Sequence, residues 1–411
     1  MKNKKVLVVS TYSYSHLTSY LDNIESILHS ESPNEKFEFY IVNVIYHGEK
    51  PQNIKYKYYI HSSDCNNLEE LERIAEEVKK WNIKFEYSFQ ISEYAVEILG
   101  YINSKLNFKG VKYDEIQKFR DKVIMKNSLS ENIKKPKLYN INDIKNDAVK
   151  YPIIVKPRCF AGSWGVKKIN SKNDLLEYLN DKNFDYSRKS NYSLNDVEVE
   201  EYIDAPICHI DGLVFNGEII FCVTSEYIGT CFGYSKGKSL GSIKGTEEQQ
   251  EKGRLFADKV NKDLRIPNGA FHLEAFWSNN NFIFLEIGIR FGGGEVVPLF
   301  EKVYGINLLY EHIKLQLGIN HLTINYFFKY FGFLVFPRPL DLKEDKYIKK
   351  IEIGYKSKSI FLSKIPSLGE NFNGNFISYS NTLGSFSFVS NEREELLCEI
   401  KKFEKGYKVE Y

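Results

Sequence analysis

Two apolar segments that carry one glutamate each are the feature that most constrains the fold. The first segment reads Phe271-His272-Leu273-Glu274, and the second, Leu285-Glu286-Ile287, places its glutamate twelve residues after the first one. If both segments are strands of one hairpin, the two carboxylates can face each other across it. Magnesium prefers oxygen ligands, often carboxylates shared with nucleotide phosphates. The hairpin therefore predicts a magnesium and phosphate site, against the plainer alternative of two exposed strand glutamates.

Length and composition limit the classes of protein to consider. A chain of 411 residues is expected to form two or three domains around substantial cores. The 56 Lys+Arg and 54 Asp+Glu nearly cancel, which argues against nucleic acid or an acidic membrane surface as a partner. The six cysteines are scattered without CxxC pairs, and no apolar run has the length of a signal core or membrane span. We therefore expect a cytoplasmic protein with free thiols.

The pattern of strands and helices predicts an α/β fold with three parts. Residues 1–112 alternate strand and helix, as in a Rossmann-like, doubly wound domain, but lack the GxGxxG of a dinucleotide site. Residues 113–195 contain a lysine-rich helix over 114–127 and a short apolar strand, and residues 181–195 look like a polar surface connection. Residues 196–411 are rich in short strands and end in a strand-rich tail, 330–411.

Two lysines are candidates for contacts with nucleotide phosphates. Lys156 closes an apolar strand and precedes a small-residue loop containing Gly162 and Ser163, which could fold over phosphates, although the sequence is not a Walker A motif. Lys122 is the second candidate. For each lysine an ordinary structural role, at a strand end or on a solvated helix, remains an alternative.

The segment Val199 to Ile203 resembles a connection between lobes. Backbone groups there could bind the edge of a purine between apolar walls, which makes candidates of Glu200, Glu201, Tyr202 and Ile203. In the next strand, His209 and Asp211 share a face and could meet ribose hydroxyls. A packed strand histidine is the alternative for His209.

Residues next to the two glutamates are candidates for contact with the reacting groups. Arg290, four residues after Glu286, falls on the same face if the strand continues, where it could clamp a phosphate or merely pair with a glutamate. His272 could orient a substrate carboxylate or an intermediate, or satisfy a core hydrogen bond. Gly293 and Gly294 would allow backbone amides to approach an anion, or simply turn the chain.

Taken together, these elements resemble the ATP-grasp superfamily, and within it the carboxylate-amine ligases that include bacterial L-amino-acid ligases. The resemblance spans roughly residues 122–318 and rests on the order of the motifs: Asp121-Lys122, Ile154-Val155-Lys156-Pro157, Ala161-Gly162-Ser163, Val199-Glu200-Glu201-Tyr202-Ile203, Asp211-Gly212, His272-Leu273-Glu274 and Leu285-Glu286-Ile287 with Arg290 and the glycines. It implies an ATP-grasp fold. One departure is Gly288, which stands where many members place an asparagine as an extra metal ligand.

The resemblance also implies an activity and its cofactors. By analogy, Lys122 and Lys156 contact the ATP phosphates, Glu274 and Glu286 hold two Mg²⁺ or Mn²⁺ ions, and Arg290 supports an acyl-phosphate. The expected reaction joins two L-amino acids into a dipeptide with release of ADP and phosphate, and by analogy the expected assembly is a homodimer. The alternatives are transfer of an amino acid to a carrier protein or a secondary-metabolite amine, an ATP-dependent phosphotransferase, and a regulatory nucleotide-binding protein.

Overall fold

The computed structural model describes residues 2–45, 49–63, 68–146, 148–180, 196–339, 344–372 and 382–411. The expected surface connection over 181–195 lies outside these ranges. None of the helices described combines the length and apolar character that crossing a membrane requires.

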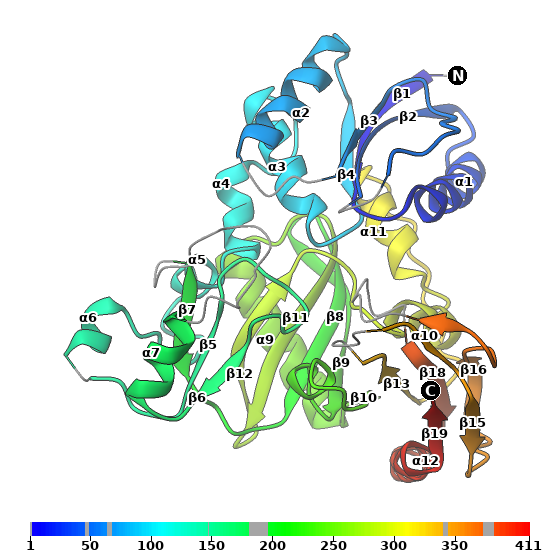
Figure 1. Cartoon of the computed structure of the whole chain (residues 1–411). Coiled ribbons are helices and arrows are strands. Elements are labelled where there is room, and N and C mark those ends of the chain that lie inside the picture. The colour runs from blue at the N-terminus through cyan, green and yellow to red at the C-terminus, as the bar shows by residue number, and fades with distance from the viewer. Residues whose placement is uncertain are drawn as a thin grey trace.

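The N-terminal part is a parallel sheet with helices on both faces, as the sequence predicts (Figure 1). Its strands pair in the order β3-β2-β1-β4. One face packs against α2 and α3, and the other against α1 and the distant α11. The elements are β1 (Lys2–Ser10), α1 (Tyr14–Glu31), β2 (Glu35–Val44), β3 (Tyr59–Ser62), α2 (Leu68–Lys80), β4 (Tyr87–Gln90), α3 (Ala95–Lys105) and α11 (Leu308–Gln316).

A small lobe follows, built on an antiparallel sheet in the order β6-β5-β7. Short helices lead into it: α4 (Tyr113–Ile116), the 3-10 helix η1 (Gln117–Phe119), α5 (Lys122–Asn127) and α6 (Ile141–Lys145). The lobe itself contains β5 (Ile153–Pro157), β6 (Lys167–Ile169), α7 (Lys172–Asn180) and β7 (Val197–Glu201).

The largest element is an antiparallel sheet of eight strands in the order β12-β11-β8-β9-β10-β13-β18-β16. Its strands are β8 (Ile207–Phe215), β9 (Glu218–Ile228), β10 (Leu240–Lys244), β11 (Gly269–Ser278), β12 (Asn281–Gly288), β13 (Tyr330–Pro337), β16 (Ile360–Lys364) and β18 (Thr382–Ser390). Around it lie α8 (Cys231–Tyr234), α9 (Glu247–Leu264), α10 (Val296–Tyr304) and α12 (Arg393–Gly406). Two small pairs complete the C-terminal part: β14 (Lys346–Tyr347) with β17 (Asn371–Phe372), and β15 (Lys350–Ile353) with β19 (Tyr407–Glu410).

The two faces of this sheet have different roles because side chains alternate along each strand. On β11, Phe271 and Leu273 point into a core shared with α9, while the intervening His272 and Glu274 point to the opposite face. That opposite face also carries Leu213 and Phe333, which pack against α10. The polar site therefore lies on the α10 face.

One prediction about an individual element was wrong, and another was incomplete. The helix predicted over 114–127 is broken before Asp121, whose carboxylate accepts hydrogen bonds from the backbone amides of Val123 and Ile124 and so starts a new helix. The tail is strand-rich, as predicted, but it also contains the fourteen-residue helix α12, which buries Leu396, Ile400 and Phe403 at helical spacing.

Candidate active site

Two cavities meet between the small lobe and the eight-stranded sheet. The first, about 320 Å³, is lined by Lys156, by residues 200–205 and Ile207, and by the small-residue loop after β5. The second, about 410 Å³, extends toward the N-terminal part and Arg290. The residues common to both walls are Lys122, Phe160, Ala161, Ser163, Cys231, Glu274 and Glu286. The predicted metal ligands thus lie where the two cavities join.

Glu274 and Glu286 are directly opposite in the β11–β12 register, as the sequence predicts. Glu274 accepts a hydrogen bond from the Tyr227 hydroxyl at 2.8 Å and lies 3.4 Å from the Nε2 atom of His272. Burial alone would raise the pKa of Glu274, but His272 and Tyr227 outweigh it and lower this pKa to about 2. Across the hairpin, the Glu286 carboxylate lies 3.5 Å from the Lys122 ammonium. Both acids present charged oxygens to the shared wall.

Behind the phosphate candidate Lys156 is a buried group of two lysines and two glutamates. Lys156 lies 2.6 Å from Glu200, and the fully buried Lys126 lies 2.6 Å from Glu198. The crossed contacts, Lys126 to Glu200 and Lys156 to Glu198, are longer at 3.0 and 3.4 Å. Burial alone would raise the pKa of Glu198, but the lysines lower it to about 2. Burial alone would lower the pKa of Lys156, but Glu198 and Glu200 raise it. Of the four residues, only Lys156 and Glu200 line the first cavity.

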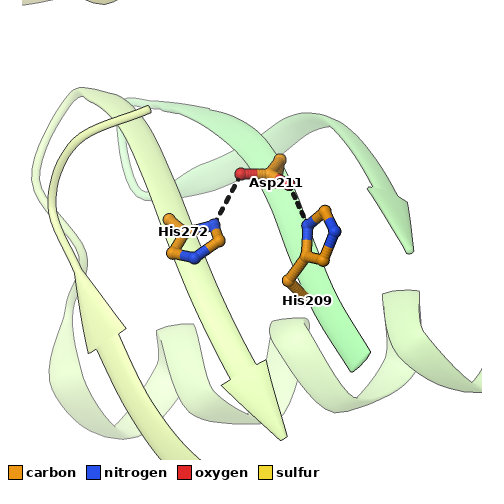
Figure 2. Close-up of side chains that lie close together, drawn as sticks. All are labelled: His209, Asp211 and His272. Carbon is orange, nitrogen blue, oxygen red and sulfur yellow. Dashed lines mark hydrogen bonds and ion pairs between the residues drawn. The ribbon is translucent and has the colours of Figure 1, made fainter. Parts of the chain in front are cut away.

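His209 and Asp211 are not where ribose contacts would require them. Asp211 is fully enclosed between two histidines, accepting from the Nδ1 atoms of His209 at 2.6 Å and His272 at 2.8 Å (Figure 2). His209 continues the chain to the Ser242 hydroxyl at 2.7 Å. Neither His209 nor Asp211 lines either cavity. The ribose assignment is therefore not supported, because the polar atoms of both side chains bind neighbouring side chains.

This buried chain of hydrogen bonds holds His272 in place. The nitrogen and oxygen atoms of His209, Asp211 and His272 lie within 4.8 Å of one another, a spacing that a metal site also shows. Here the ionised carboxylate of Asp211 accepts a hydrogen bond from each histidine instead. Burial opposes the charge of His272, but Asp211 and Glu274 outweigh it and raise the pKa of His272 to about 9. His272 therefore presents a positively charged ring to the second cavity.

Arg290 lines the second cavity, although not as a strand residue. β12 ends at Gly288, so Arg290 lies in the bend beyond it, and its Nε atom pairs with Glu93. Glu93 also pairs with the buried Arg120. Burial alone would raise the pKa of Glu93, but the two arginines lower it to about 2. A Cβ atom on Gly288 would lie 3.1 Å from the Glu93 carboxylate, so the missing side chain leaves room for this ion pair.

The remaining predicted residues are in the cavity walls. Glu201, Tyr202 and Ile203 line the first cavity, and Gly162, Gly293 and Gly294 line the second. Sequence reasoning missed Glu93, Arg120, Lys126, Glu198 and Tyr227. Only Lys126 and Glu198 had a usable signal: Lys126 follows Lys122 by one helical turn, and Glu198 shares a strand face with Glu200.

Residues 149–297, which contain most of these positions, match the family described as "ATP-grasp domain". The chain contains an ATP-grasp domain. The whole chain also has the ATP-grasp fold: it aligns over its full length with 99% of an L-amino acid ligase from Bacillus licheniformis, at a TM-score of 0.68 and 15% identity. A phosphoribosylglycinamide synthetase from Anaerococcus prevotii aligns over all of both chains at a TM-score of 0.62 and 16% identity.

Relatives by sequence match over a shorter stretch. The L-arginine-specific L-amino acid ligase of Bacillus subtilis is 23% identical over 255 residues, 59% of this chain and 60% of that protein. A formate-dependent phosphoribosylglycinamide formyltransferase of Prochlorococcus marinus is 26% identical over 239 residues, 56% of this chain and 59% of that protein. The matched stretch is thus less than two thirds of either relative.

The biotin carboxylase domain of a Hydrogenobacter thermophilus 2-oxoglutarate carboxylase, solved in complex with MgADP, covers 99% of this chain at a TM-score of 0.66 and 14% identity. The described residues fit the same groups. The donors at the cavity junction are carboxylate oxygens, the type that magnesium prefers, and they face the same wall as Lys122. The first cavity combines apolar walls from Ile203 and Phe276 with the charged end at Lys156, which suits a nucleotide base at one end and phosphates at the other.

Proposed function

We propose that this protein is an ATP- and magnesium-dependent carboxylate-amine ligase that joins two L-amino acids into a dipeptide. The observation that carries the proposal is the shared wall of the two cavities. Lys122, Glu274 and Glu286 border both the first cavity and the second cavity, which is also lined by His272 and Arg290. A phosphate bound at this wall would face a substrate in the second cavity.

The proposed reaction has two steps. A carboxylate oxygen of the first amino acid attacks the γ-phosphorus of ATP. The bond between this phosphorus and the β–γ bridging oxygen breaks, so ADP departs and an acyl-phosphate is formed. The amine of the second amino acid then attacks the acyl carbon, phosphate departs, and the amine releases a proton. Magnesium held by Glu274 and Glu286 would neutralise phosphate charge. No covalent bond to the protein is required.

The chain's own residues position and neutralise the reacting groups. Lys122 and Lys156 hold phosphate oxygens, while the cationic His272 and Arg290 face the charge that develops on the acyl oxygen. Glu93 and Arg120 fix the orientation of Arg290 from the N-terminal side.

Release of ADP and phosphate with single amino acids and with pairs tests the proposal, with the product identified by mass spectrometry. We expect turnover that requires two amino acids and yields a dipeptide. If turnover requires a carrier protein or another amine, the product is an amide on that acceptor and not a dipeptide. ADP release with one substrate and a stable phosphorylated product would mean a phosphotransferase. No turnover with any amino acid would reject the ligase proposal.

Replacing one metal ligand separates catalysis from folding. Glu286→Gln removes the charge while keeping the size of the side chain, so we expect ADP release to fall at least about 100-fold with little change in the melting temperature. Glu218→Gln is the matched control, since Glu218 is exposed on β9 outside both cavities. Full activity of Glu286→Gln would show that Glu286 does not hold the metal.

The setting of the reaction is part of the same proposal. We infer that it takes place in the cytoplasm, with free amino acids as substrates and a homodimer as the assembly. The nearly balanced charge of the chain supports small molecules as substrates.

A further inference from the structure

The second cavity changes in character across the eight-stranded sheet. The charged groups that the sheet contributes lie on β11, β12 and the loop after them, at one side of the sheet, and Glu93, Arg120 and Lys122 add charges from outside the sheet. In the sheet order, β10 and β13 lie three and four strands beyond β11, and there Leu240, Phe333 and Val335 line the same cavity. Val296 of α10 completes this apolar wall, and each of these four side chains is at most 4% exposed.

The glycine loop, residues 292–294, connects the charged end of the cavity to the apolar wall. A Cβ atom on Gly292 would lie 3.1 Å from the Nδ1 atom of His272, and one on Gly294 would lie 3.6 Å from the Phe333 ring. A substrate held at His272 and Arg290 can therefore extend along this loop toward Phe333.

The acids that line this cavity are already paired with cations or hydrogen-bond donors. Among its described lining residues the acids are Glu93, Glu274 and Glu286. Glu93 pairs with Arg120 and Arg290, Glu274 contacts His272, and Glu286 contacts Lys122. The wall formed by Leu240, Val296, Phe333 and Val335 has no acid in this lining. Glu295, which directly precedes Val296 outside the lining, is already bonded to Lys364 and Ser385. A lysine or arginine side chain placed there would bury its charge without a partner, which is strongly unfavourable.

We infer that the second cavity receives an apolar amino-acid side chain against Leu240, Val296, Phe333 and Val335, and rejects basic ones. This inference rests on the proposed ligase function. It sets the chain apart from the Bacillus subtilis relative, which is described as L-arginine-specific. Apolar contact favours leucine, methionine or phenylalanine, because their side chains leave water on binding.

The first test is a panel of amino acids, each paired with glycine, alanine and itself, with kcat/KM measured from ADP release. We expect leucine, methionine or phenylalanine to exceed arginine and lysine by about 100-fold or more. Turnover with arginine or lysine equal to that with leucine would overturn the inference and leave the ligase function standing. Absence of turnover with every pair would instead reject the ligase function, so the two failures are distinguishable.

The second test compares two phenylalanines of one strand face. Phe333→Ala enlarges the cavity, so we expect the ratio of kcat/KM for phenylalanine to that for leucine to rise about 10-fold. Phe331→Ala is the control: Phe331 is equally buried on β13 but packs against the rings of Phe300 and Tyr304 outside the cavity. It should lower the melting temperature similarly without changing the ratio.

The comparison remains decisive if Phe333→Ala does not fold. Val335→Ala then removes less volume from the same wall and should shift the same ratio in the same direction by a smaller factor. An unchanged ratio in the folded wall variant, or an equal shift in Phe331→Ala, would overturn the inference.

Discussion

At the scale of single residues, the site depends on buried charges that compensate one another. Lys126 is fully enclosed and lines neither cavity, so its role is to neutralise Glu198. Without Lys126, the cation nearest Glu198 is Lys156 at 3.4 Å, the lysine that is proposed to bind phosphate. Because Lys126 neutralises Glu198, Lys156 can bind a phosphate without leaving Glu198 unpaired.

Replacing Lys126 tests this compensation. We expect Lys126→Met to destabilise the fold by about 3 kcal/mol, because it leaves a buried carboxylate without its main partner, and to raise the KM for ATP several-fold. The double variant Lys126→Met/Glu198→Gln removes both charges and should recover part of both losses. Thermal melting and steady-state kinetics measure the two effects. Equal melting temperatures of the single and double variants would contradict the pairing.

At the scale of elements, Glu295 ties the glycine loop to the C-terminal strands. It directly precedes α10 and is buried. Its carboxylate accepts hydrogen bonds from Ser385 on β18 at 2.8 Å and from Lys364 on β16 at 2.9 Å. The strands of the tail therefore help to fix Gly293 and Gly294 beside the second cavity.

Loss of this tie should be measurable in both stability and substrate binding. We expect Glu295→Ala to cost about 2 kcal/mol, since it leaves the buried Ser385 hydroxyl without its acceptor, and to raise the KM for amino acids. Glu295→Gln keeps an acceptor oxygen and should lose less. Lys364→Met is the control, because the Lys364 side chain is 63% exposed and its ion pair contributes little. If Glu295→Ala melts at the wild-type temperature, the contacts of Glu295 with the C-terminal strands do not stabilise the fold.

The same elements explain how far the sequence was informative. Alternation of apolar and polar residues predicted the β11–β12 hairpin and the face that carries both acids. Helix α12 was missed although Leu396, Ile400 and Phe403 repeat at helical spacing, because neighbouring turns had suggested strands throughout the tail. Arg290 was expected on a strand, but its position depends on Glu93, about two hundred residues earlier in the chain.

At the scale of the whole molecule, the N-terminal part is joined to the large sheet through polar contacts that local sequence patterns do not reveal. Glu93, which also pairs with Arg120, contacts Arg290 from one side. On the other side, His312 of α11 accepts from the backbone amide of Ala270 on β11 and lies 2.8 Å from the carbonyl oxygen of Gln90 on β4. Motif order predicted several residues that line the two cavities, but long-range pairs such as these required the three-dimensional structure.

His312 makes this joint sensitive to acid. Its burial lowers the pKa of His312 from 6.5 to about 4, so between these values the unfolded chain binds a proton that the folded chain does not. Stability therefore falls as the pH decreases from 6.5 toward 4, by about 3 kcal/mol at most. The other strongly shifted groups act in different ranges: the raised pKa of His272 acts above pH 6.5, and the lowered pKa of Glu93 acts below about 4.5.

The variant His312→Asn removes the titrating ring and keeps an acceptor near the amide of Ala270. We expect it to melt at a lower temperature than the wild type at pH 7.5, and to lose less further stability between pH 6.5 and 4.5. His29→Gln, at an exposed position of α1, should retain the wild-type pH dependence. Melting curves without nucleotide or magnesium measure the difference. The slope of stability against pH reports only the protons taken up on unfolding. If His312→Asn keeps the wild-type slope, another group causes the acid sensitivity, and His312 has only a structural role.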